Sequence, residues 1–303
     1  MDRSAILTHG LTKDYGAGRG LFDLDLEVAR AEIFGYLGPN GAGKTTTIRL
    51  LMGMIHPTRG AGFVFGLDAQ RQAVEVKRHV GYLPGELPAF GGLRGSEIVA
   101  YVGGLRGGVD PKRVRALTQR FELDLGQRFR EYSHGNKQKL AIVLAFIHRP
   151  ELLVLDEPTT GLDPLNQQEF YGLLREVRAE GATIFLSSHI LSEVEHVCDR
   201  VGILRAGKLV RVAGLEELHH IRVREVDIEF VDEPPAARLR AVAGLEQLTI
   251  DGRHVRGTVR GSIAPLMAAI AGQRIVDFVS REPSLEEIFL AYYQGSESAG
   301  AAG

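Results

Sequence analysis

A glycine-rich loop carries the clearest chemistry in the chain. Residues Gly38 to Thr46 read GPNGAGKTT, which matches G-x-x-x-x-G-K-[ST], between the strand-like IFGYL and the helix-like TTTIRLLMGM. Such glycines let backbone N–H groups surround phosphate oxygens, Lys44 can neutralise the β- and γ-phosphates, and the Thr45 hydroxyl can hold Mg²⁺. The residues expected to contact a nucleoside triphosphate here are Gly38, Pro39, Asn40, Gly41, Ala42, Gly43, Lys44, Thr45 and Thr46. The strand and helix context disfavours the alternative, a glycine-rich turn with an incidental lysine.

Two carboxylates end an apolar segment later in the chain. ELLVLDEP, Glu151 to Pro158, shows no alternation of apolar and polar residues, which predicts a strand buried on both faces. Ligands of open parallel sheets lie at the carboxyl ends of the strands, so Asp156 and Glu157 are expected beside the phosphate loop. Neighbouring strand residues point in opposite directions, so Asp156 can hold Mg²⁺ while Glu157 polarises an attacking water. A helix N-cap followed by a first-turn acid is the alternative.

A histidine follows another strand at the same predicted edge. TIFLSS, Thr183 to Ser188, directly precedes His189. This position allows His189 to contact the γ-phosphate and the attacking water. A lone histidine after a strand is usually structural, so the catalytic interpretation depends on the motifs around it.

The elements that must position these residues alternate between strands and helices up to residue 214. That alternation predicts an α/β fold with a mostly parallel central sheet. The strands expected in this sheet are Ile33–Leu37, His79–Leu83, Leu152–Leu155, Thr183–Ser187 and Val201–Arg205. The strands expected in a smaller antiparallel layer are Ala5–His9, Leu21–Val28 and Gly62–Phe65. Residues from about 86 to 140 are predicted to form an inserted helical subdomain within this first domain, residues 1–214.

A second, smaller α+β domain is predicted for residues 215–294. Its pattern has the order β-α-β-β-α-β, which is typical of a ferredoxin-like domain. The expected elements are the strands Glu225–Val231, Gln247–Ile250, His254–Val259 and Arg274–Val279, the helices Ala236–Ala243 and Ile263–Ala271, and a closing helix near Ser284–Tyr293. Residues 295–303 are small and polar, so we expect a flexible tail.

Composition limits the possible partners. The 36 basic and 38 acidic residues give a formal net charge of −2, and no run of one sign predicts a nucleic-acid or lipid patch. The longest apolar stretch, Leu140–Ile147, is shorter than the ~20 residues that a membrane-spanning helix needs, and no signal-peptide pattern opens the chain. Cys198 is the only cysteine, which excludes an intrachain disulfide and fits a cytosolic setting.

With these motifs, residues 1 to about 214 resemble the ATP-binding subunit of ABC transporters. The resemblance implies that Tyr15, upstream of the phosphate loop, stacks on adenine. It also implies that Asp156 is the metal aspartate, Glu157 the catalytic glutamate and His189 the switch histidine of the family.

The segment Tyr132 to Asn136 reads YSHGN and resembles the family signature LSGGQ. In the family this segment contacts the γ-phosphate of ATP bound to the opposite subunit, so two subunits close head to tail over two ATP molecules. Gly161-Leu162-Asp163 resembles the loop that crosses to the partner. The contacts implied across the dimer are made by Ser133, Gly135, Asn136 and Asp163. Ser133 also fits an ordinary N-cap, and the two roles are compatible.

Three positions depart from the family pattern. His134 and Asn136 replace a glycine and a glutamine of the signature. After the strand VGYLP the family usually has a glutamine that senses Mg²⁺ and the γ-phosphate, whereas this chain has Gly85 followed by Glu86. The sequence leaves open whether Glu86 or a water molecule takes over that role. Residues 84–96 are either the family's contact with its membrane subunits or a loop broken by proline and glycine.

The resemblance implies an ATP-hydrolysing subunit that uses ATP and Mg²⁺ and acts on a separate membrane permease. The C-terminal DFVSREPSLEEIFLAYY resembles the extension of bacterial drug and antibiotic exporter ATPases, which implies export of a drug, antibiotic or other hydrophobic small molecule. We therefore expect a homodimer at the cytoplasmic face of the membrane, with a C-terminal domain that serves subunit contact or regulation. The alternative is a non-transport ABC ATPase acting on nucleic acid or ribosomes, which balanced charge and a single ATPase domain disfavour. Guanine selectivity is unsupported because Lys139 occupies the aspartate position of an NKxD motif.

Overall fold

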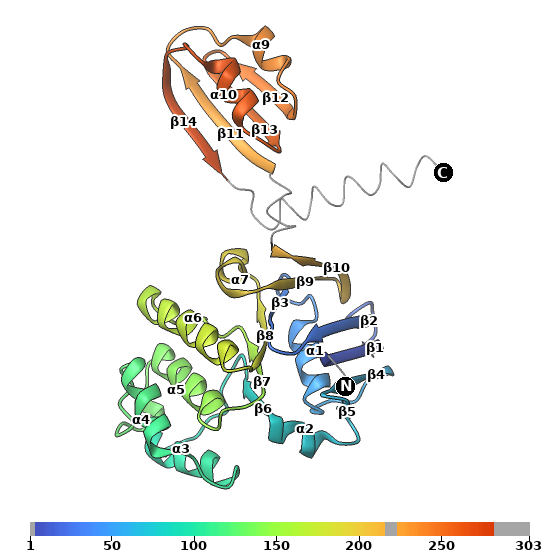
Figure 1. Ribbon diagram of the computed structural model, residues 1–303, viewed down its shortest axis with the longest axis vertical. Coiled ribbons are helices and arrows are strands. Elements are labelled where there is room, and N and C mark those ends of the chain that lie inside the picture. Colours follow the sequence, from blue (N-terminus) through green and yellow to red (C-terminus); the bar gives the residue numbers. More distant parts are fainter. Residues whose placement is uncertain (1–3, 216–222, 282–303) are drawn as a thin grey trace. The chain divides into compact units, whose positions relative to one another are not determined.

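The computed structural model describes residues 4–215 and 223–281, and the chain divides into two compact units (Figure 1). The first unit ends at Ala213 and the second begins at Gly214. The predicted helix near Ser284–Tyr293 and the predicted tail 295–303 lie outside the described residues. Within the described part of the chain, every helix is too short or too polar to cross a bilayer.

A six-stranded sheet forms the centre of the first unit, with the order β10-β9-β3-β8-β7-β6. Its strands are β3 (Ile33–Leu37), β6 (Val80–Leu83), β7 (Leu152–Asp156), β8 (Thr183–Ser188), β9 (Arg200–Arg205) and β10 (Lys208–Gly214). The neighbours from β9 to β6 pair in parallel, and β3, β7 and β8 are buried along their whole length. The carboxyl ends of β3, β7 and β8 therefore meet at one edge of the sheet.

One predicted strand of this sheet begins later than expected. His79 ends the helix α2 (Ala73–His79), so β6 starts at Val80. Lys77, Arg78 and His79 form the basic last turn of α2, where positive charge is favourable at a helix C-terminus. The His79 Nδ1 atom also lies 2.7 Å from Glu151 Oε1.

A second sheet of the first unit has the order β2-β1-β4-β5 and is antiparallel. Its strands are β1 (Ser4–Asp14), β2 (Gly20–Ala29), β4 (Arg59–Val64) and β5 (Leu67–Asp68). β1 is longer than predicted because its pairing with β2 shifts register between Thr8 and Leu11 and then continues to Asp14. Buried residues from both sheets and from α1 (Lys44–Leu51) share one apolar core, which includes Ile6, Phe34 and Ile48.

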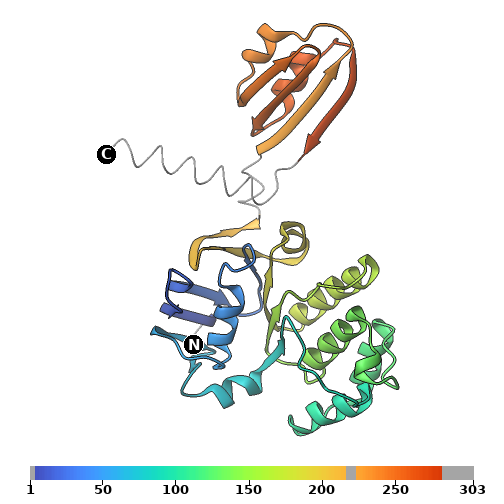
Figure 2. The same ribbon diagram turned by 180° about the vertical axis from the view of Figure 1, so that it is seen from behind.

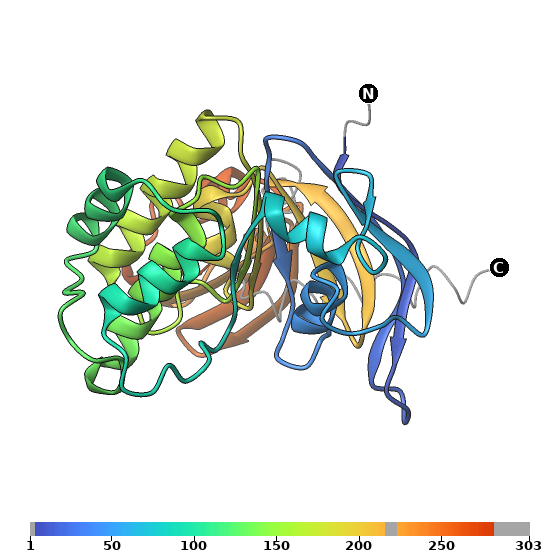
Figure 3. The same ribbon diagram turned by 90° about the horizontal axis from the view of Figure 1, so that it is seen from below.

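The remaining helices of the first unit gather on the side of the central sheet away from α1 (Figure 3). They are α3 (Gly95–Gly104), α4 (Pro111–Arg120), the short 3₁₀ helix η1 (Phe129–Glu131), α5 (His134–Phe146), α6 (Pro164–Ala179) and α7 (Leu191–Val197). The apolar stretch that starts at Leu140 is the buried half of α5. Cys198 ends α7 and is buried, and burial strongly raises the pKa of its thiol.

Within residues 223–281 the second unit forms a four-stranded antiparallel sheet with the order β12-β13-β11-β14, accompanied by the helices α9 and α10 (Figure 2). Its elements are β11 (Val223–Phe230), α9 (Ala236–Arg240), β12 (Leu245–Asp251), β13 (His254–Arg260), α10 (Ala264–Ile270) and β14 (Ile275–Arg281). Alternation along β11 buries Val226, Ile228 and Phe230 in one core with Leu239 of α9 and Leu266 of α10.

Candidate active site

The phosphate loop runs from the end of β3 into α1, and backbone contacts hold it. Gly41 and Gly43 have φ angles of 80° and 110°, a region that glycine enters without steric cost. A Cβ atom at Gly38 would overlap the Leu204 carbonyl oxygen of β9, so the loop needs glycine there. The Gly207 N–H, in the turn between β9 and β10, donates to the Ala42 carbonyl at 2.9 Å. The loop is thus fixed by segments distant in sequence.

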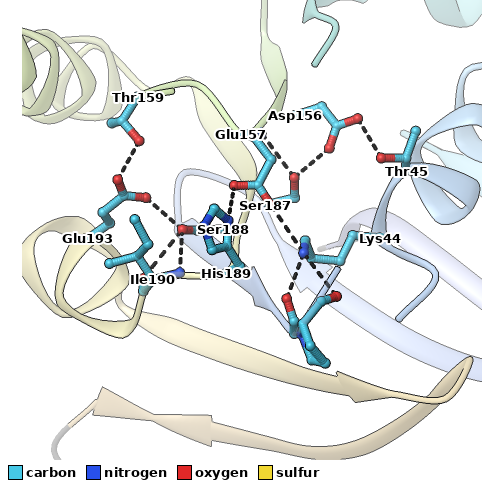
Figure 4. A network of polar contacts seen from close by, with 12 residues as sticks. Lys44, Thr45, Asp156, Glu157, Thr159, Ser187, Ser188, His189, Ile190 and Glu193 are labelled. Atoms are coloured by element: carbon cyan, nitrogen blue, oxygen red, sulfur yellow. Dashed lines mark hydrogen bonds and ion pairs between the residues drawn. The ribbon is translucent and has the colours of Figure 1, made fainter. Parts of the chain in front are cut away.

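Lys44 is the first residue of α1 and is only 6% exposed. Its ammonium donates to the carbonyl oxygens of Gly38 at 2.6 Å and Pro39 at 3.3 Å. It also forms an ion pair of 3.1 Å with Glu157 Oε1 (Figure 4). The cation therefore lies at the mouth of the loop, next to the predicted catalytic carboxylate.

Asp156 is the last residue of β7 and is 2% exposed. Its Oδ2 accepts from the Thr45 hydroxyl at 2.8 Å, and its Oδ1 accepts from the Ser187 hydroxyl of β8 at 2.6 Å. A hydroxyl and a carboxylate oxygen thus converge, which is the donor chemistry that Mg²⁺ prefers. Among residues 4–215 and 223–281 no cluster of three or more His, Cys, Asp or Glu side chains could hold a metal alone. Thr45 and Asp156 therefore fit a Mg²⁺ that also binds nucleotide phosphates.

Glu157 leaves the strand in an unusual backbone conformation. Its φ angle is 50°, in the left-handed region, and its N–H donates to the Ser187 hydroxyl at 3.1 Å. A turn at this residue, rather than strand alternation, gives the two carboxylates their different directions. Neither of them caps a helix, because the next helix, α6, begins at Pro164 with Asp163 as its N-cap. The N-cap alternative is therefore wrong.

His189 follows β8 and contacts Glu157 directly. Its Nδ1 atom lies 2.8 Å from Glu157 Oε2. An ionised carboxylate only accepts hydrogen bonds, so Nδ1 carries the proton in this contact. One carboxylate thus lies between the Lys44 ammonium and the His189 imidazole (Figure 4).

A cavity of about 470 Å³ surrounds the phosphate loop. It is lined by Tyr15, Gly18, Arg19, Gly20, Pro39, Asn40, Gly41, Gly43, Lys44, Thr45, Thr46, Glu157, Ala206 and Gly207. Tyr15 is 49% exposed, and the Lys13 ammonium lies 5.5 Å from its ring centroid. Of the phosphate-loop residues predicted to contact the nucleotide, Gly38 and Ala42 do not line this cavity within the described part of the chain, and neither does His189.

Sequence reasoning missed five lining residues. Gly18, Arg19 and Gly20 follow Tyr15 in a tight turn, which the Tyr15 N–H closes by donating to the Arg19 carbonyl at 2.9 Å. The glycines of GAGRG could have indicated that turn. Ala206 and Gly207 belong to the β9–β10 turn, and only the tertiary pairing of β3 with β9 brings them to the loop.

The signature segment begins α5. Ser133 is its N-cap and accepts from the Asn136 N–H at 3.2 Å. A Cβ atom at Gly135 would lie 2.9 Å from the Gly161 carbonyl oxygen, and one at Gly161 would overlap the His134 ring. His134 and Gly135 therefore pack on the loop that leads to Asp163.

Asp163 occupies the same kind of position at the start of α6. It is exposed and accepts from the Asn166 backbone N–H at 3.0 Å. That hydrogen bond, with a second from the Asn166 side chain, lowers the pKa of Asp163. None of the four residues predicted to contact the opposite ATP lines the phosphate-loop cavity among the described residues.

The departure from the family's glutamine lies beside Asp156. A Cβ atom at Gly85 would be 3.5 Å from Asp156 Oδ2, which is an ordinary contact distance. The Glu86 side chain is exposed. Burial, reinforced by the charge of Asp156, raises the pKa of nearby Tyr82 to about 12.

A phosphate loop after β3, a carboxylate pair after β7 and a parallel sheet between them define a P-loop nucleoside triphosphatase. The family model described as "ABC transporter" matches residues 21–160. Bacitracin transport ATP-binding protein BcrA of Enterococcus faecalis is 37% identical over 238 residues, 77% of each chain. Daunorubicin resistance ATP-binding protein DrrA3 of Streptomyces coeruleorubidus is 33% identical over 303 residues, 96% of each chain.

Solved structures agree with the sequence relatives. An ATP-binding subunit of an ABC transporter superposes with a TM-score of 0.66 and 31% identity, covering 71% of this chain and 92% of that one. The chain therefore belongs to the ABC transporter ATP-binding proteins, and it is the ATP-binding and ATP-hydrolysing subunit.

Proposed function

We propose that Lys44 and the phosphate-loop backbone bind the phosphates of ATP, that Thr45 and Asp156 hold Mg²⁺, and that Glu157 with His189 activates the attacking water. The observation that carries this proposal is a connected set of contacts at one sheet edge. Thr45 donates to Asp156 at 2.8 Å, Lys44 pairs with Glu157 at 3.1 Å, and His189 contacts Glu157 at 2.8 Å. When bound, Mg²⁺ would neutralise charge on the phosphates.

Glu157 is the group best placed to act on water. The carboxylate is 20% exposed, lines the cavity, and is oriented by His189 at one oxygen. Its other oxygen forms an ion pair with the Lys44 ammonium. The phosphate oxygens of ATP would compete strongly for that ammonium. Binding of ATP would therefore draw Lys44 toward phosphate and leave Glu157 oxygen Oε1 to accept a proton from water.

The second half of each reaction site is proposed to come from another copy of the chain. Ser133, Gly135, Asn136 and Asp163 begin two helices whose N-termini favour anions. They lie outside the phosphate-loop cavity, so we assign them to the ATP of the partner in a head-to-tail homodimer. Tyr15, exposed at the cavity, would stack on adenine.

We further propose that the dimer drives a separate permease from the cytoplasmic face of the membrane. Relatives named for bacitracin transport and daunorubicin resistance support export of a drug, antibiotic or other hydrophobic small molecule. Balanced charge supports the absence of a nucleic-acid partner. The domain limits proposed are 1–214 for the ATPase, with its helical subdomain at about 86–140, and 215–294 for an accessory or regulatory domain. The strand order β12-β13-β11-β14 supports a ferredoxin-like assignment for the latter.

Two experiments test these roles. The Glu157→Gln variant should bind ATP with wild-type affinity but lose turnover by about 10²–10⁴-fold, because the amide cannot take a proton. Wild-type turnover would refute the role of Glu157.

Copurification of the full chain from native membranes should recover a polytopic membrane protein, and recovery of only soluble partners would contradict the transporter assignment.

A further inference from the structure

A buried carboxylate on α7 connects the two segments that carry Glu157 and His189. Glu193 lies in the first turn of α7 and is 8% exposed. Its Oε1 accepts from the Thr159 hydroxyl at 2.5 Å, and its Oε2 accepts from the Ser188 hydroxyl at 2.6 Å (Figure 4). Each carboxylate oxygen is therefore bonded to a different segment of the chain.

These hydrogen bonds are made where water is nearly excluded. Thr159 is 5% exposed and Ser188 is fully buried. Among the ion pairs of residues 4–215 and 223–281, none joins Glu193 to a basic side chain. A buried carboxylate is costly to desolvate, so its two hydroxyl donors must be kept in place. Directional bonds to both oxygens then fix the spacing of the segments that provide the donors.

Those segments flank the Glu157–His189 contact on both sides. Thr159 follows Glu157 by two residues and begins the loop that ends at Asp163. Ser188 directly precedes His189, and its hydroxyl also accepts from the Ile190 N–H at 3.0 Å. Glu193 therefore restrains the backbone next to both members of the contact without touching either of them.

We propose that Glu193 is a positioning residue for ATP hydrolysis. It keeps His189 and Glu157 at their observed relative position and connects them to the loop that ends at Asp163. The inference rests on the proposed roles of Glu157 and His189. It adds a residue that links the partner-facing loop to the water-activating pair of the same chain. Loss of the link leaves the nucleotide cavity intact, because Glu193 does not line it.

The test compares steady-state ATP hydrolysis by full-chain variants. Glu193→Ala should lower kcat about 10- to 100-fold with less than about a threefold change in the KM for ATP, because a small displacement of reacting groups is costly in rate. Thr159→Val and Ser188→Ala each remove one hydroxyl donor and should give smaller losses of kcat. Unchanged kcat in Glu193→Ala would overturn the proposal.

A second carboxylate provides the matched control. Glu32 is also 8% exposed, accepts from the Ala29 N–H at 2.6 Å and pairs with Arg200 at 3.2 Å. It precedes β3, so it lies at the sheet edge opposite the site. Glu32→Ala should lower the melting temperature but leave kcat at the wild-type value in the folded protein. An equal loss of kcat in both variants would mean that Glu193 acts through stability alone.

A double-mutant cycle separates this inference from the proposed catalytic roles. If Glu193 acts through His189, Glu193→Ala should cost little further kcat in a His189→Ala background. Additive losses would overturn the inference while leaving the role of His189 standing. Wild-type kcat in His189→Ala would instead refute the proposed function. If Glu193→Ala does not fold, Glu193→Gln, which keeps one acceptor oxygen, is used in the same cycle with the same criteria.

Discussion

The polar residues on two sides of the first unit differ in burial and in the partners they contact. The phosphate-loop side carries Lys44 and Asp156, and the signature side carries Ser133 and Asp163. Lys44 and Asp156 are 6% and 2% exposed and bond to residues distant in sequence. Ser133 and Asp163 are exposed, and each side chain accepts a hydrogen bond from a backbone N–H in the first turn of its own helix. Contacts between distant segments fix the phosphate-loop side within one chain, whereas exposed helix N-termini leave acceptor and donor groups for another molecule.

The largest effect is expected at the buried side. Lys44→Ala removes the cation that faces both the loop carbonyls and Glu157. We expect ATP binding and turnover to fall together, turnover by about 10²–10³-fold, because a preorganised electrostatic contact is lost. Nucleotide titration and steady-state hydrolysis measure the two effects. Wild-type ATP affinity in the folded variant would contradict the assignment of this cavity.

A substitution on the signature side should lower turnover but leave ATP binding by the monomer nearly unchanged. Ser133→Arg places a long side chain at the N-terminus of α5, so it should block closure over the partner's ATP and lower turnover at least about tenfold. Binding of ATP to the monomer should stay within about twofold of wild type, because Ser133 lies outside the cavity. Ser262→Arg is the matched control, since Ser262 is exposed and accepts from the Ala264 N–H at the start of α10. Equal losses of turnover in both variants would contradict a specific role of Ser133 at the partner's ATP.

Tyr15 lies on the phosphate-loop side but is exposed. Its substitution therefore tests whether location or exposure decides the effect of a residue on ATP binding. Tyr15→Ala should weaken ATP binding roughly 5- to 150-fold, because stacking of a base on an aromatic ring contributes about 1–3 kcal/mol. Tyr15→Phe should retain most of the affinity. An ATP affinity unchanged by Tyr15→Ala would show that the ring does not contact the base.

The smallest effect concerns packing within the signature side, where the signature segment meets the loop that ends at Asp163. Gly161→Ala should lower the free energy of unfolding by about 1–2 kcal/mol for its left-handed backbone, and by more because its Cβ would overlap His134. Gly181→Ala controls for the backbone cost, since Gly181 has a φ of 99° with nothing within 4 Å of a Cβ atom. Denaturant unfolding of both variants measures the difference. Equal losses of unfolding free energy in both variants would mean that the His134 side chain moves aside at no cost.

The sequence predicts best what lies directly beside a strand end. The phosphate loop, Asp156, Glu157 and His189 lie at the carboxyl ends of β3, β7 and β8, so the parallel sheet alone brings them to one edge. The five strands predicted for the central sheet each overlap an observed strand. The left-handed turn at Glu157 and the length of β1 were not predictable, because a side-chain contact and a register shift decide them.

Residues that act across the fold were also missed. Ser187 and Gly207 have no motif of their own, and they reach the site only through the pairing of β8 with β7 and of β9 with β3. Glu193 lies on α7 and is joined to the site by its hydrogen bonds with Thr159 and Ser188. The ring of His134, which departs from the signature, packs on Gly161, a contact that depends on the fold. Nothing in the structure explains the asparagine at position 136.

Mixing two inactive variants tests most directly whether the signature side serves the neighbour. Ser133→Arg and Glu157→Gln chains, each nearly inactive alone, should form mixed dimers in which one of the two sites combines intact halves. Random equal mixing should then restore about a quarter of wild-type ATP hydrolysis. A chain carrying both substitutions should suppress wild-type activity when mixed with it. If the first mixture stays inactive and the double variant only dilutes the wild type, each signature segment serves its own ATP and the account is wrong.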